Sequence, residues 1–171
     1  RTVFKKSKIS MRKLILILSV IFVFSCTGNK SLKTTQIAQN YLDTYSKRKE
    51  IDKILSFYSD NFEYKNISFG TETNDSRFLI EQIYGWNDPK MKFETDESIE
   101  VEQIISNDST IVVRGKSMPY EYNGKVVEGN NFVIWLDLDK EYKIKRQTDW
   151  FDYPMEEIIE AYQLKNAFEI Q

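Results

Sequence analysis

The feature that most constrains the fold is a pair of strand-like runs on either side of Asn123-Gly124. Residues 109–122 and 125–138 are rich in β-branched and aromatic side chains, which favour strands. Both central positions of a type I′ turn need a positive φ, which asparagine and glycine adopt most readily. The two runs are therefore predicted to form a long antiparallel hairpin, and Gly129 is a candidate position for a β-bulge in the returning strand.

Helix-like and strand-like patterns surround this hairpin. Strands are predicted over residues 61–69, 98–106 and 142–151, where the pattern repeats at every second position. Helical spacing predicts two early helices, a third helix capped by Asn74 or Asp75, and a last helix that begins near Pro154. The apolar positions of the first two helices are Ile37, Tyr41, Leu42 and Tyr45, then Ile51, Ile54, Leu55 and Tyr58. For 171 residues, this order predicts one α+β domain with helices on one face of a bent antiparallel sheet.

The N-terminal segment has the pattern of a targeting signal. Arg12 and Lys13 precede an apolar run of eleven residues, Leu14–Phe24, which is shorter than the roughly 20 residues of a membrane-spanning helix. The run ends in Val23-Phe24-Ser25-Cys26, which resembles a bacterial lipobox and holds the only cysteine. We therefore expect a signal peptide over residues 1–25, of which residues 1–10 could be a spurious extension before Met11, and a lipidated Cys26 with a polar tether over residues 26–35. These features predict a lipid-anchored protein of the bacterial cell envelope. Thr27, in place of the aspartate that retains lipoproteins at the inner membrane of enteric bacteria, favours the outer membrane.

Charge and composition exclude several classes of function. The first 25 residues hold six basic side chains and no acid, so the rest of the chain has 18 basic and 26 acidic side chains. An acidic domain repels a phosphate backbone, so we expect no nucleic-acid partner. The chain has no histidine, the usual general base near neutral pH and the commonest metal ligand. We therefore expect no metal and no cofactor, and any acid–base chemistry would fall to carboxylates and tyrosines.

Three segments together resemble the nuclear transport factor 2-like superfamily, in its SnoaL-like branch. They are "ILSFYSDNFEYKN" (54–66), the hairpin at Asn123-Gly124, and "YKIKRQTDWFDYP" (142–154). The resemblance implies a SnoaL-like domain over residues 36–165 and a tail over residues 166–171. It also implies a cone in which a curved antiparallel sheet wraps around three to four helices, with an apolar pocket in its mouth. Members of this superfamily commonly form homodimers through the outer face of the sheet.

The limonene epoxide hydrolases offer a closer comparison for the pocket. The resemblance places their Tyr-x-Asn pair at Tyr64 and Asn66, one aspartate at Asp149 and the bridging arginine at Arg114. Their second aspartate corresponds to Lys116. That mechanism needs two carboxylates with different pKa values, one as acid and one as base. With a lysine at one position the relay is broken, so we do not expect epoxide hydrolysis by this route.

Three functions remain open for the pocket. The leading hypothesis is a binding module in which Tyr64, Asn66, Arg114, Lys116 and Asp149 hold a small, partly apolar molecule. The second is a hydrolase or isomerase that uses Asp149 and Tyr64 as catalytic residues. The third is a non-catalytic protein-interaction module with a filled interior. A buried Asp149 would need a partner, and Arg114, Lys116 and Tyr64 are the candidates, whereas Asp152 is placed to cap the last helix.

Overall fold

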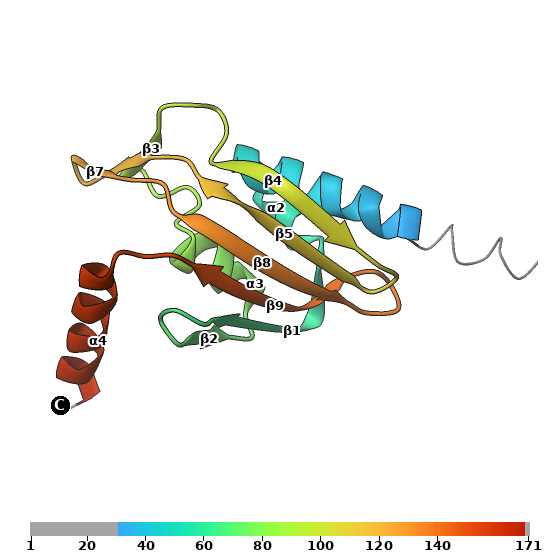
Figure 1. Cartoon of the computed structure of the whole chain (residues 1–171). Coiled ribbons are helices and arrows are strands. Elements are labelled where there is room, and N and C mark those ends of the chain that lie inside the picture. Colours follow the sequence, from blue (N-terminus) through green and yellow to red (C-terminus); the bar gives the residue numbers. More distant parts are fainter. Residues whose placement is uncertain (1–30, 170–171) are drawn as a thin grey trace, which may run out of the picture.

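The computed structural model describes residues 31–169 and is built around a six-stranded sheet (Figure 1). The strand order is β2-β1-β9-β8-β5-β4, and β3-β6-β7 form a second, three-stranded sheet. The strands of the large sheet are β1 (Tyr58–Asn66), β2 (Thr71–Thr73), β4 (Ile99–Ser106), β5 (Thr110–Ser117), β8 (Asn131–Leu138) and β9 (Ile144–Phe151). Those of the small sheet are β3 (Met91–Phe93), β6 (Tyr120–Tyr122) and β7 (Lys125–Val127).

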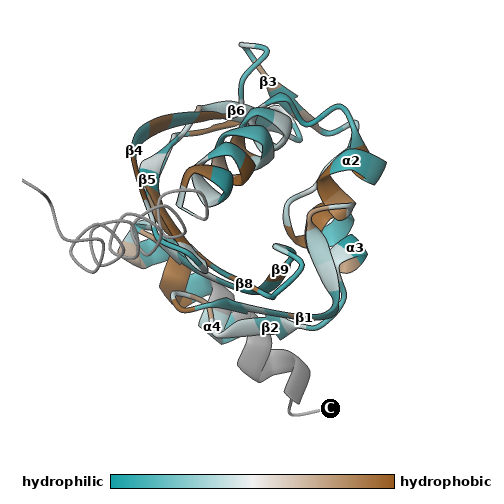
Figure 2. Ribbon diagram, turned by 90° about the vertical axis from the view of Figure 1, so that its right-hand side faces the viewer, coloured by the Kyte–Doolittle hydropathy of each residue, from teal (hydrophilic) through white to brown (hydrophobic). Residues whose placement is uncertain are grey.

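The first helix lies inside the curve of the large sheet, and the next two helical segments lie on its open side (Figure 2). A helix over residues 31–47 is followed by α2 (Ile51–Leu55), by α3 (Ser76–Phe78) with the π-helix η1 (Leu79–Ile83), and by α4 (Met155–Glu169). Asp75 begins α3, because its Oδ1 accepts hydrogen bonds from the backbone N–H groups of Arg77 (2.9 Å) and Phe78 (3.1 Å). Gly85, with φ +62°, follows η1 and ends this helical segment.

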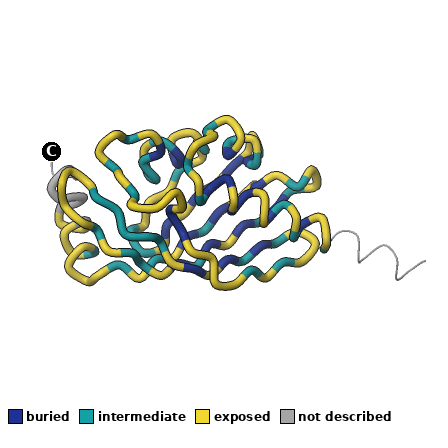
Figure 3. The backbone as a smooth tube through the Cα atoms, turned by 90° about the horizontal axis from the view of Figure 1, so that it is seen from above, coloured by how far each residue is buried: buried dark blue, intermediate teal, exposed yellow. Residues whose placement is uncertain are grey.

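The sheet curls around the first helix to make a cone. Figure 2 shows β4, β5, β8 and β1 in an arc around this helix, with α2 and α3 on the open side. Buried and exposed positions alternate along the strands, as the dark segments of Figure 3 show. The core is one cluster of buried side chains. It joins Tyr41, Leu42 and Tyr45 of the first helix to Ile134 and the other inward side chains of the sheet. The predicted α+β cone is thus confirmed.

One pair of strands corrects the expectation of an antiparallel sheet. β1 and β9 run parallel, with Tyr64 beside Gln147 and Asn66 beside Asp149. A parallel pair needs a long connection, and here the connection holds the third helix and the whole hairpin. The sheet is therefore mixed.

The hairpin at Asn123-Gly124 is present but is divided into two parts. Both turn residues have positive φ, +52° and +77°, as a type I′ turn requires. β6 and β7 form the tip in the small sheet, whereas β5 and β8 pair in the large sheet. The break falls at Pro119, which has no N–H to donate, and at Gly129, where a Cβ atom would collide with the backbone carbonyl of Ser117. The single long strands predicted over residues 109–122 and 125–138 are therefore each two strands.

The two ends of the chain also differ from expectation. Residues 31–35, which the sequence predicts to belong to the tether (26–35), are helical. α4 runs without a break through the predicted boundary at 165, and it extends away from the cone, with Met155, Ile159 and Tyr162 exposed (Figure 1). The predicted signal peptide (1–25) and Cys26 lie outside the described residues. Within residues 31–169, no helix is both long and apolar enough to cross a membrane.

Candidate functional site

The parallel pairing of β1 with β9 creates a polar cluster inside the cone. Inward positions alternate on both strands, so Tyr64 and Asn66 of β1 share a face with Gln147 and Asp149 of β9. Gln147 and Asp149 are fully buried, and Tyr64 and Asn66 are 3% and 4% exposed. Two neighbouring strands thus place an aspartate, two amides and a phenol together in the interior.

Tyr84 reaches this cluster from the π-helix. Its backbone N–H donates to Leu79 O, five residues earlier, at 2.9 Å. Such π-helical turns are rare and are frequent at functional sites. The Tyr84 hydroxyl donates a short hydrogen bond to Asp149 Oδ2, and Gln147 Nε2 donates to Asp149 Oδ1 (3.1 Å) and to the Tyr84 hydroxyl (2.6 Å). The wider π-helical turn thus brings the Tyr84 hydroxyl to the carboxylate of Asp149 on β9.

The hydrogen-bonded chain continues deeper into the core. Gln147 Oε1 accepts from the hydroxyls of Tyr58 (2.9 Å) and Tyr41 (3.3 Å), which lie 3.0 Å apart. We call Tyr41, Tyr58, Tyr84, Gln147 and Asp149 the tyrosine–aspartate network. Because its members satisfy one another, the polar atoms of this network are buried without being left unpaired.

The carboxyl group of Asp149 has an unusual pKa. Burial raises the pKa of Asp149 to about 6, although Tyr84, Gln147 and the nearby Tyr64 hydroxyl act in the opposite direction by stabilising the carboxylate. No salt bridge involves Asp149 among the described residues. Its negative charge is therefore supported by neutral donors alone.

A cavity of about 220 Å³ lies next to the network. Its wall is mainly aromatic and apolar, with a few polar side chains at separate points. The apolar and aromatic part includes Tyr45, Ile83, Tyr84, Met91, Phe93, Tyr120, Phe132, Phe151 and Tyr153; the polar part includes Arg48, Asn66, Ser98, Ser117 and Asn130. Asp149 is not part of the wall, because Tyr64, Asn66 and Tyr84 line the cavity in front of it. Apolar walls with a few placed polar groups are typical of small-molecule sites.

Tyr64 provides a polar atom without a partner in this wall. Its hydroxyl is buried and makes no hydrogen bond of standard geometry to a described residue, although Asp149, Asn66 and Tyr84 lie close enough to influence it. Burial and the charge of Asp149 raise its pKa, so the hydroxyl keeps its proton and can act as a donor. The ring stands nearly perpendicular to that of Tyr84, at a centroid distance of 6.1 Å. After a shift of this side chain toward the cavity, an oxygen atom of a bound molecule could accept a hydrogen bond from the hydroxyl.

Two of the predicted pocket residues lie elsewhere. The prediction that Arg114 and Lys116 line the pocket is wrong, because both point outward from β5 while Val113 and Gly115 point inward. Arg114 Nε forms an exposed ion pair with Glu102 at 3.0 Å. Neither residue can therefore pair with Asp149, which is held by Tyr84 and Gln147.

The other predicted positions are placed as follows. Tyr64 and Asn66 line the cavity, and Asp149 lies behind them. The carboxylate of Asp152 accepts a hydrogen bond from Asn131 Nδ2 at 2.6 Å, across the β8–β9 edge. Among residues 31–169, no group of three or more histidine, cysteine, aspartate or glutamate side chains is arranged to hold a metal ion.

Sequence reasoning missed Tyr84, Arg48 and the role of Gln147. Gln147 could have been found, because it shares a strand face with Asp149 at a spacing of two. Tyr84 and Arg48 follow helical segments, and their approach to the cavity depends on a π-turn and on a positive φ that the sequence does not signal.

Comparisons with known proteins show the same fold. No protein-family model and no curated protein sequence matches the chain. An LEH-like epoxide hydrolase from M. tuberculosis matches with a TM-score of 0.57 and 12% identity, covering 77% of this chain and 90% of that one. A SnoaL-like polyketide cyclase from Shewanella putrefaciens CN-32 matches with a TM-score of 0.55 and 16% identity, covering 81% and 98%. A protein with a ketosteroid isomerase-like fold from Catenulispora acidiphila, in complex with trimethylamine, matches with a TM-score of 0.51 and 10% identity, covering 70% and 85%.

At these low identities, the comparisons establish the fold and not the activity. Structures named NTF2-like are also among the matches. The chain therefore has the NTF2-like fold, in the company of SnoaL-like and ketosteroid isomerase-like structures.

Proposed function

We propose that this domain binds a small, partly apolar molecule in the cavity of the cone. The observation that carries the proposal is the cavity, whose mainly aromatic wall includes Tyr64, a residue whose buried hydroxyl has no hydrogen bond of standard geometry among the described residues. A buried polar group without a partner destabilises a protein by about 1–3 kcal/mol. A shift of the Tyr64 side chain toward the cavity would let a ligand supply the missing partner, and the mainly aromatic wall provides the apolar contact.

Support also comes from the fold. The Catenulispora acidiphila protein of the same fold holds trimethylamine, and the Shewanella protein is named a cyclase, so both are associated with small molecules. The cavity favours a binding module over an interaction module with a filled interior.

The experiment that tests this proposal compares Tyr64→Phe with Tyr58→Phe. Removal of the Tyr64 hydroxyl takes away an unpaired group, so the free energy of unfolding without ligand should rise by about 1 kcal/mol. Tyr58→Phe removes a donor to Gln147 and should lower it by about 1–2 kcal/mol. The neutral bicyclic amide 2-naphthamide should raise the thermal unfolding temperature of the wild type and bind more weakly to Tyr64→Phe.

The opposite results would count against a binding site. If Tyr64→Phe is as destabilising as Tyr58→Phe, the Tyr64 hydroxyl has a partner and the argument loses its basis. If neither 2-naphthamide nor any member of a broad library of small ring compounds shifts the unfolding temperature of the wild type, the cavity is only a packing defect.

The raised pKa of Asp149 supports a second candidate, a hydrolase or isomerase that uses Asp149 and Tyr64. A carboxyl group with a pKa of about 6 can exchange a proton near neutral pH. Asp149 does not line the cavity, whereas Tyr84, which donates to its carboxylate, does, so a side chain would have to move before a substrate in the cavity could touch Asp149. A turnover that falls with the protonation of Asp149 and is lost in Asp149→Asn would favour the enzyme, whereas undiminished turnover in Asp149→Asn would remove it.

We also propose that the domain is held at the bacterial envelope by lipid on Cys26, with an outer-membrane location as the more specific expectation. The proposal rests on the apolar run Leu14–Phe24 and on the lipobox-like end of that run. Acyl chains contribute about 0.8 kcal/mol per buried methylene, so two or three chains anchor a domain of this size firmly. A binding site close to a membrane surface would meet partly apolar molecules at a high local concentration.

A further inference from the structure

Arg48 places a cationic group in the wall of the cavity. The residue follows the first helix with φ +51°, a left-handed conformation that is uncommon for residues with a side chain. Its Nη2 donates to the backbone carbonyl oxygen of Tyr84 at 2.6 Å and contacts Met91 Sδ at 3.3 Å. The guanidinium carbon lies 5.2 Å from the ring centre of Phe93 and 5.6 Å from that of Trp86. The group is thus held in place against aromatic rings.

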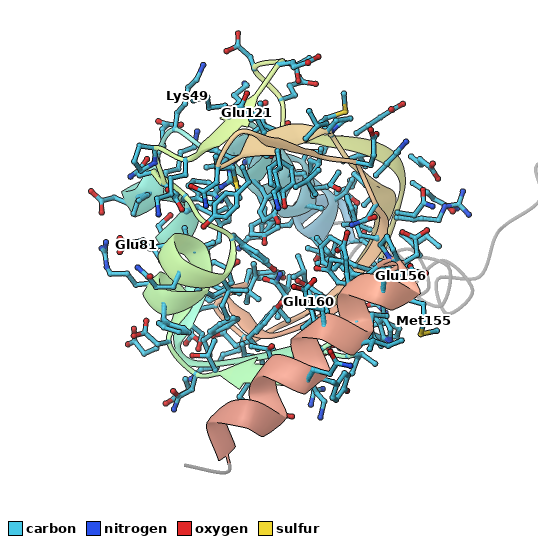
Figure 4. The ribbon with its side chains drawn as sticks, turned by 90° about the vertical axis from the view of Figure 1, so that its left-hand side faces the viewer. Lys49, Glu81, Glu121, Met155, Glu156 and Glu160 are labelled. Carbon is cyan, nitrogen blue, oxygen red and sulfur yellow. The ribbon has the colours of Figure 1, made fainter. Side chains whose placement is uncertain are left out.

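Arg48 differs from the other three arginines of the described chain. Arg77, Arg114 and Arg146 each form an ion pair with an acid, at 2.6 Å, 3.0 Å and 2.6 Å. Within residues 31–169, no carboxylate lies within ion-pair distance of Arg48. The neighbouring Lys49 pairs with Asp96 and points away from the interior in Figure 4. The guanidinium of Arg48 is therefore the cation that faces the cavity without a counter-charge.

A structural role accounts for only part of the arginine. The hydrogen bond to Tyr84 O satisfies a carbonyl at the end of the π-helix, and any amide or ammonium donor at this position could make it. Both contacts use Nη2, so Nε and Nη1 keep N–H groups that no described residue accepts. Burial lowers the pKa of Arg48, because the charged form is poorly solvated there. A retained positive charge in this environment needs a second explanation.

We infer that Arg48 binds the carboxylate of a small aromatic or cyclic acid whose ring occupies the cavity. This inference rests on the proposed binding function and names the class of ligand. Since Nη2 is engaged by Tyr84 O and Met91 Sδ, a carboxylate would accept a charge-assisted hydrogen bond from one of the remaining N–H groups, on Nε or Nη1. The cavity volume of about 220 Å³ exceeds the ~150 Å³ that a benzene-binding cavity offers, which suits one or two fused rings.

The two charges near the cavity fix the direction of such a ligand. Arg48 contacts the backbone carbonyl of Tyr84, whereas Asp149 contacts the hydroxyl at the far end of the same residue. Tyr45 interacts with both charges, since its pKa is raised by Asp149 and lowered by Arg48 after the larger effect of burial. A carboxylate at Arg48 therefore lies away from Asp149, and a second oxygen on the ring would lie toward the Tyr64 hydroxyl.

The test uses two probes of equal shape, 2-naphthoate and 2-naphthamide, at pH 7. Isothermal titration of the wild type should show that the acid binds at least tenfold more tightly than the amide. Arg48→Gln keeps a donor for Tyr84 O but removes the charge, so the ratio of the two affinities should fall to about one, with the amide affinity little changed. Arg114→Gln is the matched control, because it removes an arginine on the outer face and should leave both affinities unchanged.

Each outcome decides a different point. Equal binding of acid and amide to the wild type would overturn the role of Arg48 and leave the binding proposal standing. No binding of either probe would reject the inference about the aromatic acid, and the binding proposal would fall with it only if the library of ring compounds also gave no shift. If Arg48→Gln is too unstable to titrate, Arg48→Lys replaces it. That variant keeps the positive charge, so the preference for the acid should survive, and loss of the preference would refute recognition of the carboxylate by the charge at this position.

Discussion

Replacement of Asp149 by asparagine should remove a pH dependence of stability that comes from this single carboxyl group. Burial raises the pKa of Asp149 in the folded chain to about 6, whereas an aspartate in an unfolded chain has a pKa of ~3.9. The difference is about two pH units, and each pH unit corresponds to ~1.4 kcal/mol. The group therefore contributes a change of about 3 kcal/mol to the free energy of unfolding.

The sign of this change follows from proton binding. Between about pH 4 and pH 6, the folded chain holds the Asp149 proton and the unfolded chain has released it. The free energy of unfolding falls with pH wherever the folded state binds more protons. The contribution of Asp149 is therefore most favourable below about pH 4, declines by about 3 kcal/mol up to about pH 6, and is constant above that.

The assay is urea unfolding of residues 27–171 across this pH range, for the wild type and for Asp149→Asn. The other carboxyl groups are present in both proteins, so their titrations cancel in the difference between the two curves. Asparagine presents an N–H group to Gln147 Nε2, itself a donor, which adds a penalty of about 1–3 kcal/mol at every pH. The slope of the difference, and not its offset, is therefore the result. If the difference in the free energy of unfolding does not change between pH 4 and pH 7, Asp149 is not a buried carboxyl group without a counter-charge, which refutes the reasoning.

Three further predictions concern the sheet and the anchor. Gly115→Ala should destabilise the fold by several kcal/mol, because its methyl group would meet a backbone carbonyl of β4. Gly124→Ala should cost about 1–2 kcal/mol, from its positive φ alone. Equal losses of the two variants in chemical denaturation would contradict this prediction. Cys26→Ser in the full chain should move the protein from the detergent phase to the aqueous phase in a phase-separation assay, and an unchanged distribution would exclude lipidation. If two copies associate through the outer face of the sheet, sedimentation should show a dimer. The double variant Trp135→Glu with Trp150→Glu changes side chains that are 42% and 39% exposed and should be a monomer. A monomeric wild type would contradict this prediction.

Strand periodicity predicted part of the site because inward and outward positions alternate strictly. Tyr64 and Asn66 alternate with charged neighbours, so the sequence itself shows that they share a face. For β5 the same reasoning failed. Ile111, Val112 and Val113 are all apolar, so no alternation marks the inner face, and the resemblance to epoxide hydrolases put Arg114 on the wrong side. An apolar run leaves the register of a strand open, and one step exchanges the two faces.

The remaining features of the site depend on contacts between distant parts of the chain. Tyr84 meets Asp149 across 65 positions in the sequence, and a single π-turn decides that its hydroxyl reaches the carboxylate. Arg48 stands in a basic stretch, Lys47 to Lys49, that reads as a solvated helix end. Its entry into the cavity wall follows from a positive φ, which local propensity does not predict for arginine.

The parallel pairing of β1 with β9 has a consequence for how the binding wall comes into existence during folding. Asn66 and Asp149 become neighbours only after the third helix and the whole hairpin have been laid down between them. Contacts of such large sequence separation form late and slowly, because the intervening loop must be closed first. A chain that stops before β9 would keep the β5–β8 hairpin but would have neither Gln147 nor Asp149. This protein should therefore bind its ligand only once β9 has been synthesised and paired with β1. During refolding, ligand binding should recover more slowly than the secondary structure.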